Sequence, residues 1–152
     1  MTKKITIYTD GSALGNPGPG GWGAVLMSGN HRKELSGGFY ETTNNRMELL
    51  AIIEALKAIK TTGYSIEVFS DSQYVVNAIN KGWLKKWAAK NYAKRPNADL
   101  WKKLYPLLTK YQPKVNWVKA HVGIAENEKC DQLAKEAAEQ PTKADDGYIA
   151  QK

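Results

Sequence analysis

The sequence predicts an α/β protein in which one mixed β-sheet is flanked by helices. The first 40 residues contain segments that alternate between apolar and polar side chains, which is the period of a strand. From residue 43 onward, segments with apolar residues at helical spacing are separated by strand-like segments. The 152 residues, 42% of them hydrophobic, suffice for one domain with a sizeable core.

The N-terminal part is predicted to form an antiparallel meander of three strands. Residues 5–10 alternate in polarity, and residues 22–27 and 33–40 have the composition of two further strands. A turn-rich segment, SGNH, separates the last two strands, which favours antiparallel pairing.

Helices and strands alternate in the rest of the chain. A helix is predicted over residues 43–60, with Thr42 or Thr43 as its N-cap. The elements predicted after it are a strand at 65–71, short helices at 72–80 and 83–91, a helix at 99–108, a strand at 115–120 and a helix at 126–139. Residues 1–141 are predicted to form the domain, and residues 142–152, which have little to bury, a mobile tail.

This topology brings two acids to one edge of the sheet. The strand at 65–71 should run parallel to the strand at 5–10, because a helix-containing crossover joins them. Ligands in such sheets bind beyond the carboxyl ends of the parallel strands. Asp10 and Asp71 end these two strands, so both carboxylates are expected at this edge.

Two more acids are expected nearby. Glu48 lies about one turn into the first helix, and Asp131 lies early in the last one. Singly each acid is weak evidence, since an Asp after a strand is usually a turn residue and Asp131 with Lys135 has the spacing of a helix ion pair. A cluster of all four would suit Mg²⁺ or Mn²⁺, and two such ions activate a water and stabilise the leaving oxygen of a phosphodiester.

Six of the chain's 13 glycines lie between Gly11 and Gly23. The letters GPGGWG match a dinucleotide fingerprint, but they open a strand and not a helix, and no P-loop lysine follows GNPGPG. Two interpretations stay open: a tight turn between strands, or a loop whose backbone approaches a ribose-phosphate chain.

Charge and cysteine content bear on partners and location. The net charge is +7, with 22 Lys+Arg against 15 Asp+Glu, which favours a polyanionic partner although basic surfaces without a partner are common. The lone cysteine, Cys130, excludes an internal disulfide and fits a reducing compartment. No signal peptide is visible and apolar runs are far shorter than the ~20 residues of a membrane span, so a cytoplasmic protein without a membrane partner is expected.

Four segments together resemble the signature blocks of ribonuclease H type 1, in that family's order and at its usual intervals: TDGSALGNPGPGGWG, TTNNRMELLA, SDSQYV and AHVGIAENEKCDQLA. The resemblance spans about residues 4–140 and implies a ribonuclease H-like fold, a five-stranded mixed sheet of order 3-2-1-4-5 flanked by helices. It also implies a monomeric, divalent-metal-dependent endonuclease. This enzyme would hydrolyse the RNA strand of RNA–DNA hybrids without sequence preference, leaving 5′-phosphate and 3′-hydroxyl ends.

The resemblance assigns roles to individual residues. Asp10, Glu48, Asp71 and Asp131 would be the catalytic carboxylates, holding two Mg²⁺ ions, or Mn²⁺ in their place, with substrate bound. His121 matches a loop histidine that assists proton transfer or product release, although a lone histidine is more often a surface residue. The implied contacts to ribose or base edges are Gly11, Asn16, Asn44, Gln73 and Glu48 itself, and those to a DNA phosphate are Thr43 and Asn97.

Residues 81–95 hold six Lys/Arg and no acid, interleaved with aromatic residues. This composition is typical of surfaces that bind phosphates and pack on sugars, and it resembles the basic protrusion of the family. The expected hybrid contacts are Trp83, Trp87, Lys85, Lys86 and Lys90. The alternative is an exposed helix whose tryptophans belong to the core.

Other functions fit part of the pattern. A non-catalytic module that binds hybrids or double-stranded RNA would explain the basic charge, but clustered acids weaken phosphate binding unless a metal compensates. A glycosidase would need only two of the acids and would leave the basic segment unexplained. Transposase- and integrase-like nucleases share the fold, and the block TTNNRMEL favours the hybrid nuclease over them.

Overall fold

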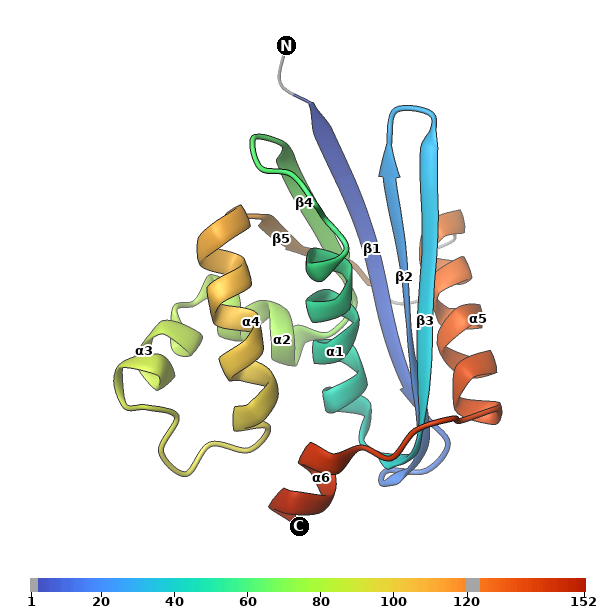
Figure 1. Cartoon of the computed structure of the whole chain (residues 1–152), viewed down its shortest axis with the longest axis vertical. Coiled ribbons are helices and arrows are strands. Elements are labelled where there is room, and N and C mark those ends of the chain that lie inside the picture. The colour runs from blue at the N-terminus through green and yellow to red at the C-terminus, as the bar shows by residue number, and fades with distance from the viewer. Residues whose placement is uncertain (1–2, 120–123) are drawn as a thin grey trace.

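The computed structural model describes residues 3–119 and 124–152, which form one five-stranded sheet with helices on both faces (Figure 1). The strand order is β3-β2-β1-β4-β5, as predicted. β1 pairs antiparallel with β2, and β2 with β3, whereas β4 and β5 run parallel to β1. The strands are β1 (Lys4–Ala13), β2 (Gly18–Ser28), β3 (His31–Thr42), β4 (Ser65–Ser70) and β5 (Lys114–Trp117).

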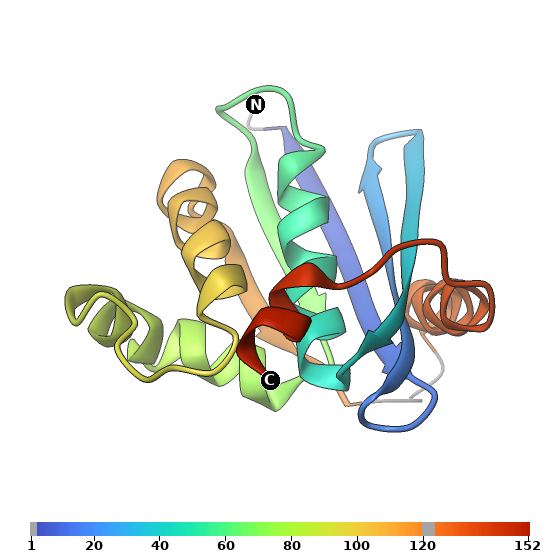
Figure 2. The same cartoon turned by 60° about the horizontal axis from the view of Figure 1, so that its bottom comes forward.

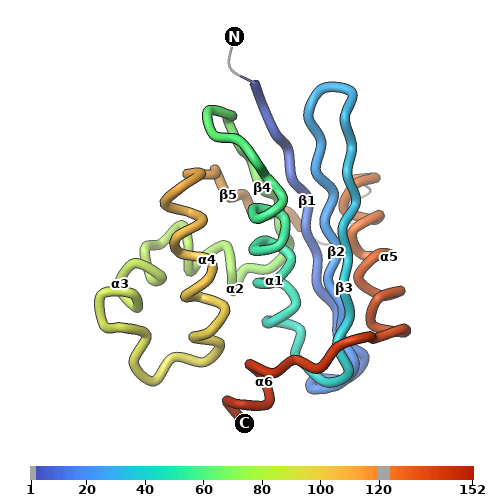
Figure 3. The backbone as a smooth tube through the Cα atoms, in the orientation of Figure 1, coloured from blue at the N-terminus to red at the C-terminus, as the bar shows by residue number. Residues whose placement is uncertain are grey.

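The helices form two layers (Figures 1 and 2). α1 packs on one face of the sheet together with α4, and α5 covers β1, β2 and β3 from the opposite face. α2 and α3 follow β4 in the chain, and α3 projects to the side of the molecule (Figure 3). The helices are α1 (Asn44–Lys57), α2 (Gln73–Asn80), α3 (Trp83–Ala89), α4 (Ala98–Tyr111), α5 (Ala125–Glu139) and α6 (Asp146–Gln151).

Local signals set several of these boundaries. Thr43 is the N-cap of α1, as predicted, and its hydroxyl accepts from the Arg46 N–H at 3.3 Å. β1 and β2 are longer than their polarity pattern indicates, because they stay paired as far as Ala13 and Gly20. Most of the glycine-rich segment is therefore strand, and only residues 14–17 connect β1 to β2.

Glycines in β2 allow α5 to lie directly on the sheet. A Cβ on Gly23 would lie 2.5 Å from the Cys130 carbonyl oxygen, and one on Gly21 would lie 2.7 Å from the Ala138 nitrogen. Larger side chains would push the helix away from the strand. These glycines therefore serve helix–sheet packing, a role that neither interpretation of the segment had included.

The C-terminal segment holds one buried acid and a short helix. Asp145 is 7% exposed and α6 follows it, whereas the other side chains of residues 142–152 are exposed or half-buried. The carboxylate of Asp145 accepts from Arg46 Nε at 2.9 Å and from Arg46 Nη2 at 3.0 Å, and from the Thr42 hydroxyl at 2.6 Å. This ion pair attaches the segment to α1, and the Tyr40 N–H donates to the Lys143 carbonyl at 2.9 Å.

Among the described residues, every helix is too short or too polar to traverse a lipid bilayer.

Candidate active site

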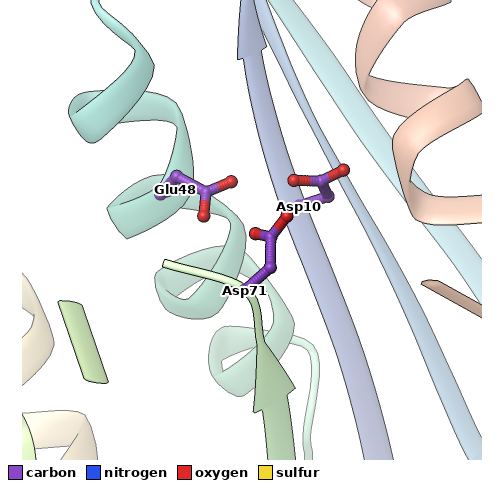
Figure 4. Close-up of side chains that lie close together, drawn as sticks. All are labelled: Asp10, Glu48 and Asp71. Atoms are coloured by element: carbon purple, nitrogen blue, oxygen red, sulfur yellow. The ribbon is translucent and has the colours of Figure 1, made fainter. Parts of the chain in front are cut away.

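Three carboxylates meet at the carboxyl end of the parallel strands. They belong to Asp10 on β1, Glu48 on α1 and Asp71 directly after β4, and their oxygens lie within 4.8 Å of one another (Figure 4). The last parallel pair of β1 and β4 is Thr9 with Ser70, so the next residue on each strand is an acid. This is the placement that the crossover predicts for Asp10 and Asp71.

Gly11 brings Glu48 to this edge. A Cβ at position 11 would lie 2.6 Å from the Met47 carbonyl carbon, so only glycine lets α1 approach β1 so closely. The Gly11 N–H donates to Asp10 Oδ1 at 2.9 Å and also to Glu48 Oε1. One backbone donor thus orients two of the three carboxylates.

Asp71 is held from the other side by Trp117 of β5. The indole N–H of Trp117 donates to the Asp71 carbonyl oxygen at 3.1 Å, although the side chain is 46% exposed. This hydrogen bond holds the backbone of Asp71 next to β5.

The cluster is electrostatically strained without a compensating positive charge. Burial first, and then repulsion by Asp10 and Asp71, raises the pKa of Glu48 well above its usual value; Glu48 is 4% exposed. Burial raises the pKa of Asp10 to about 7, with repulsion from Asp71 and Asp131 adding to it, against hydrogen bonds with Glu48 and Gly11 that lower it. The arrangement favours a proton or a cation between the carboxylates.

Asp131 is a neighbour of this group and not a member of it. Its carboxylate makes an ion pair with Lys135 one turn along α5, with 2.9 Å between Asp131 Oδ2 and Lys135 Nζ. The ion pair within the helix, which the sequence left open as an alternative, is therefore present. The charge of Asp131 nevertheless contributes to the raised pKa of Asp10. His121 lies outside the described residues.

Several expected substrate contacts line the pocket over the carboxylates. This pocket has a volume of about 280 Å³, and its walls include Asn44, Gln73 and Tyr74 as well as the three acids and Gly11. Asn16, in the connection between β1 and β2, accepts from the Asn44 N–H at 3.2 Å through its Oδ1. The glycine-rich hairpin is thereby tied to the rim of the pocket.

Thr43 and Asn97 are linked through a residue that sequence reasoning missed. The Arg46 backbone N–H bonds Thr43, and its guanidinium donates to Asn97 Oδ1 at 3.3 Å. Arg46 is 1% exposed and is neutralised by Asp99 and Asp145. In the sequence it is one more arginine in a helix, and no local signal marks it as buried.

The basic segment separates its two tryptophans. Trp87 packs edge-on against the buried Trp101 with 5.2 Å between ring centroids, and Arg95 lies over the Trp87 ring at 4.2 Å. Trp83 is 39% exposed, and Lys81 lies over its ring at 5.5 Å. Trp87 is thus a packing residue and Trp83 a surface one. The three expected lysines of this segment are exposed: Lys85, Lys86 and Lys90.

Comparisons with known proteins show which family this chain resembles. The family model of RNase H matches residues 2–139. A Ribonuclease H of Syntrophomonas wolfei is 58% identical over 140 residues, which cover 89% of this chain and 96% of that protein. A Ribonuclease H of Proteus mirabilis is 50% identical over 154 residues, covering 98% of this chain and 96% of that protein.

Solved structures show the same fold. The crystal structure of LC9-RNase H1, a type 1 RNase H with the type 2 active-site motif, superimposes with a TM-score of 0.83 at 31% identity, covering 93% of this chain and 75% of that one. LC11-RNase H1, crystallised in complex with an RNA/DNA hybrid, gives a TM-score of 0.71 at 28% identity, covering 90% of this chain and 98% of that one.

Proposed function

The chain belongs to the RNase H family, and we propose that Asp10, Glu48, Asp71 and Asp131 are the residues with which it cleaves its substrate. It is an endoribonuclease that hydrolyses the RNA strand of RNA–DNA hybrids, and its family depends on divalent metal ions. The single observation that carries the residue assignment is the meeting of three carboxylates within 4.8 Å at the carboxyl end of the parallel strands.

The donor set fits a hard divalent cation. All three side chains offer carboxylate oxygens, which suit Mg²⁺ or Mn²⁺ and not softer metals. The raised pKa values of Asp10 and Glu48 express the cost of holding these negative charges together, and a cation would remove that cost. We propose Mg²⁺ as the ion, two per site with substrate bound. Such ions, when bound, supply an activated water and stabilisation of the leaving oxygen.

The protein's own groups prepare the site. The Gly11 N–H keeps Asp10 and Glu48 oriented, and the indole of Trp117 holds the backbone of Asp71. Lys135 pairs with one oxygen of Asp131, Oδ2, so Asp131 would bind an ion either through its other oxygen or after releasing Lys135. His121, outside the described residues, is proposed to assist proton transfer or product release.

Substrate recognition is proposed to extend from the pocket to both sides. Gly11, Asn16, Asn44 and Gln73 would contact ribose or base edges in the minor groove, where the 2′-hydroxyl distinguishes RNA from DNA. Thr43 and Asn97 would bind a DNA phosphate. The exposed cations of the basic segment and Trp83 would follow the backbone of the hybrid beyond it.

Product, assembly and location are further parts of the proposal. We expect cleavage without sequence preference that leaves 5′-phosphate and 3′-hydroxyl ends. All three clustered carboxylates come from one chain, so activity needs no second copy, and a monomer is expected. The free, buried Cys130 fits a reducing compartment such as the cytoplasm.

Asp10→Asn tests the residue assignment. This variant is expected to lose cleavage of an RNA–DNA hybrid in Mg²⁺ and to keep hybrid binding, because the amide retains the shape but not the charge of a metal ligand. Asp146→Asn makes the same chemical change at an exposed position of α6 and should leave cleavage unchanged.

Both variants and the unaltered protein should be incubated with a hybrid, duplex RNA and duplex DNA, each with Mg²⁺ and with EDTA. The unaltered protein should cleave only the RNA of the hybrid, and only with Mg²⁺. Cleavage by Asp10→Asn at the rate of the unaltered protein would defeat the metal assignment.

A further inference from the structure

Asn97 and Gln151 form a reciprocal pair across 54 residues of sequence. The backbone N–H of Asn97 donates to Gln151 Oε1 at 2.9 Å, and Gln151 Nε2 donates to Asn97 Oδ1 at 2.9 Å. Asn97 is 6% exposed and sits at the N-terminus of α4 with a φ of 61°, a left-handed conformation that asparagine tolerates. Gln151 is the last residue of α6, which lies beside the start of α4 (Figure 2).

These contacts fix which way the Asn97 amide faces. Its oxygen accepts from both Gln151 Nε2 and Arg46 Nη1, so both acceptor positions are used. Its Nδ2 donates one N–H to the Tyr74 hydroxyl at 3.2 Å. If the Asn97 amide were rotated by about 180°, its N–H₂ group would face the donors Gln151 Nε2 and Arg46 Nη1, and both hydrogen bonds to Oδ1 would be lost. The second N–H of Nδ2 is left, within the described part of the chain, for an acceptor from outside.

The pair sits at the place proposed for a DNA phosphate. Arg46 contacts Thr43 through its backbone and Asn97 through its guanidinium, so the two proposed phosphate contacts are joined by one residue. The segment that carries Gln151 is itself anchored there, because Asp145 binds the same guanidinium. The C-terminal segment is therefore held where Gln151 contacts Asn97.

We propose that Gln151 is a positioning residue that holds the Asn97 amide with its N–H₂ group toward the DNA phosphate of the bound hybrid. The inference rests on the proposed phosphate contact of Asn97. Gln151 need not touch the substrate, since it acts by occupying the oxygen and the backbone N–H of Asn97 and leaving the side-chain nitrogen to the phosphate.

Gln151→Met tests this role, because methionine keeps the length of the side chain and removes both hydrogen bonds. The variant is expected to bind a hybrid about three- to tenfold more weakly, the loss that one or two neutral hydrogen bonds would cause. It should raise KM and leave kcat near the value of the unaltered protein. Ile149→Met places the same residue at a 51% exposed position of the same helix and should leave both constants unchanged.

Two further measurements separate positioning from general weakening. Asn97→Ala is expected to weaken binding at least as much as Gln151→Met, and the double variant should be no weaker than Asn97→Ala alone, because both changes remove the same contact. Hybrids with single methylphosphonate substitutions along the DNA strand should reveal one position that weakens binding in the unaltered protein. That substitution should have little further effect on Gln151→Met.

The outcomes distinguish the inference from the function on which it rests. If Asn97→Ala weakens binding and Gln151→Met does not, the positioning role is wrong and the phosphate contact stands. If neither weakens binding, the phosphate contact itself is wrong and the inference falls with it. Tighter binding by Gln151→Met would also overturn the inference, because it would show that Gln151 covers the site.

Discussion

Asp145→Asn is the substitution whose effect on stability follows most directly from the structure. The carboxylate of Asp145 accepts four hydrogen bonds: two from Arg46, one from the Thr42 hydroxyl and one from the Tyr148 N–H at 3.1 Å, which caps α6. Asparagine has nearly the same shape but one oxygen fewer. Two of the four bonds are therefore lost, and an N–H₂ group is brought against donors.

The expected cost lies between that of one hydrogen bond to a charged group and that of a broken buried ion pair. A hydrogen bond to a charged group contributes about 1.5–3 kcal/mol, and removing one partner of a buried pair costs about 3–5 kcal/mol. Arg46 keeps its bidentate contact with Asp99, at 2.7 and 2.8 Å, so its charge is not left alone. We expect a loss of about 2–3 kcal/mol in the free energy of unfolding.

Thermal unfolding converts this loss into a measurable shift. With an unfolding entropy of about 2.1 cal/mol/K per residue, the 152-residue chain has roughly 0.3 kcal/mol/K, so the Tm should fall by about 6–9 °C. Asp146→Asn, at the exposed neighbouring position, should change the stability by no more than about 0.5 kcal/mol. Equal shifts in the two variants would refute the reasoning.

The same ion pair makes the stability of the protein depend on pH in the acid range. The Arg46 guanidinium lowers the pKa of Asp145 and of Asp99 below their usual values, against the opposing effect of burial. A carboxylate whose pKa is lower in the folded than in the unfolded state stabilises the folded state at pH values above the unfolded pKa, which is about 3.9 for Asp. This stabilisation is lost as the pH falls toward the pKa of the folded state. The difference between the unaltered protein and Asp145→Asn, measured by urea unfolding, should therefore shrink below about pH 4.

Three further predictions address packing, charge and substrate binding. Gly147→Ala should lower the Tm because its Cβ would lie 2.5 Å from Arg46 Nη2, and an unchanged Tm would contradict this packing. Metal-free protein should lose stability as the pH rises from about 4 to about 7, since burial, with carboxylate repulsion, raises the pKa of Asp10 to about 7. Urea unfolding should show that Mg²⁺ reduces this loss, and Asp10→Asn should not show it in full. The three exposed lysines of the basic segment, Lys85, Lys86 and Lys90, can be replaced together by alanine. Hybrid binding should weaken, and the slope of the logarithm of the binding constant against the logarithm of the salt concentration should fall in magnitude by about 2–3. An unchanged slope would show that these lysines do not contact the hybrid.

The strands, the helices and the placement of two acids were predictable from local patterns, whereas the strand order of the sheet was implied by the family resemblance. Period-two alternation and the change to helical spacing give the order of elements, and the N-cap of α1 at Thr43 follows from residue type alone. A right-handed crossover then forces Asp10 and Asp71 to one edge. For Glu48 the sequence indicates the helix, but its reach depends on the close approach at Gly11, which is a tertiary contact.

The features that were missed depend on pairs far apart in the chain. Arg46 and Asp145 are 99 residues apart, and nothing around either one marks a buried ion pair. The glycines of β2 have low strand propensity, yet they are strand because they pair with β1 and β3, and two of them, Gly21 and Gly23, also lie against α5. Asp131 illustrates a different limit, because the sequence alone could not decide between two roles for it. Both a metal ligand and an ion pair with Lys135 were compatible with the sequence, and the structure described has the ion pair.

Anomalous diffraction from crystals of the protein grown with Mn²⁺ and a bound hybrid tests the metal assignment most directly. We expect manganese peaks in coordination contact with Asp10, Glu48 and Asp71, and Asp131 released from Lys135 to reach one of the ions. Crystals that hold the hybrid over these carboxylates and show no manganese beside them would contradict the account.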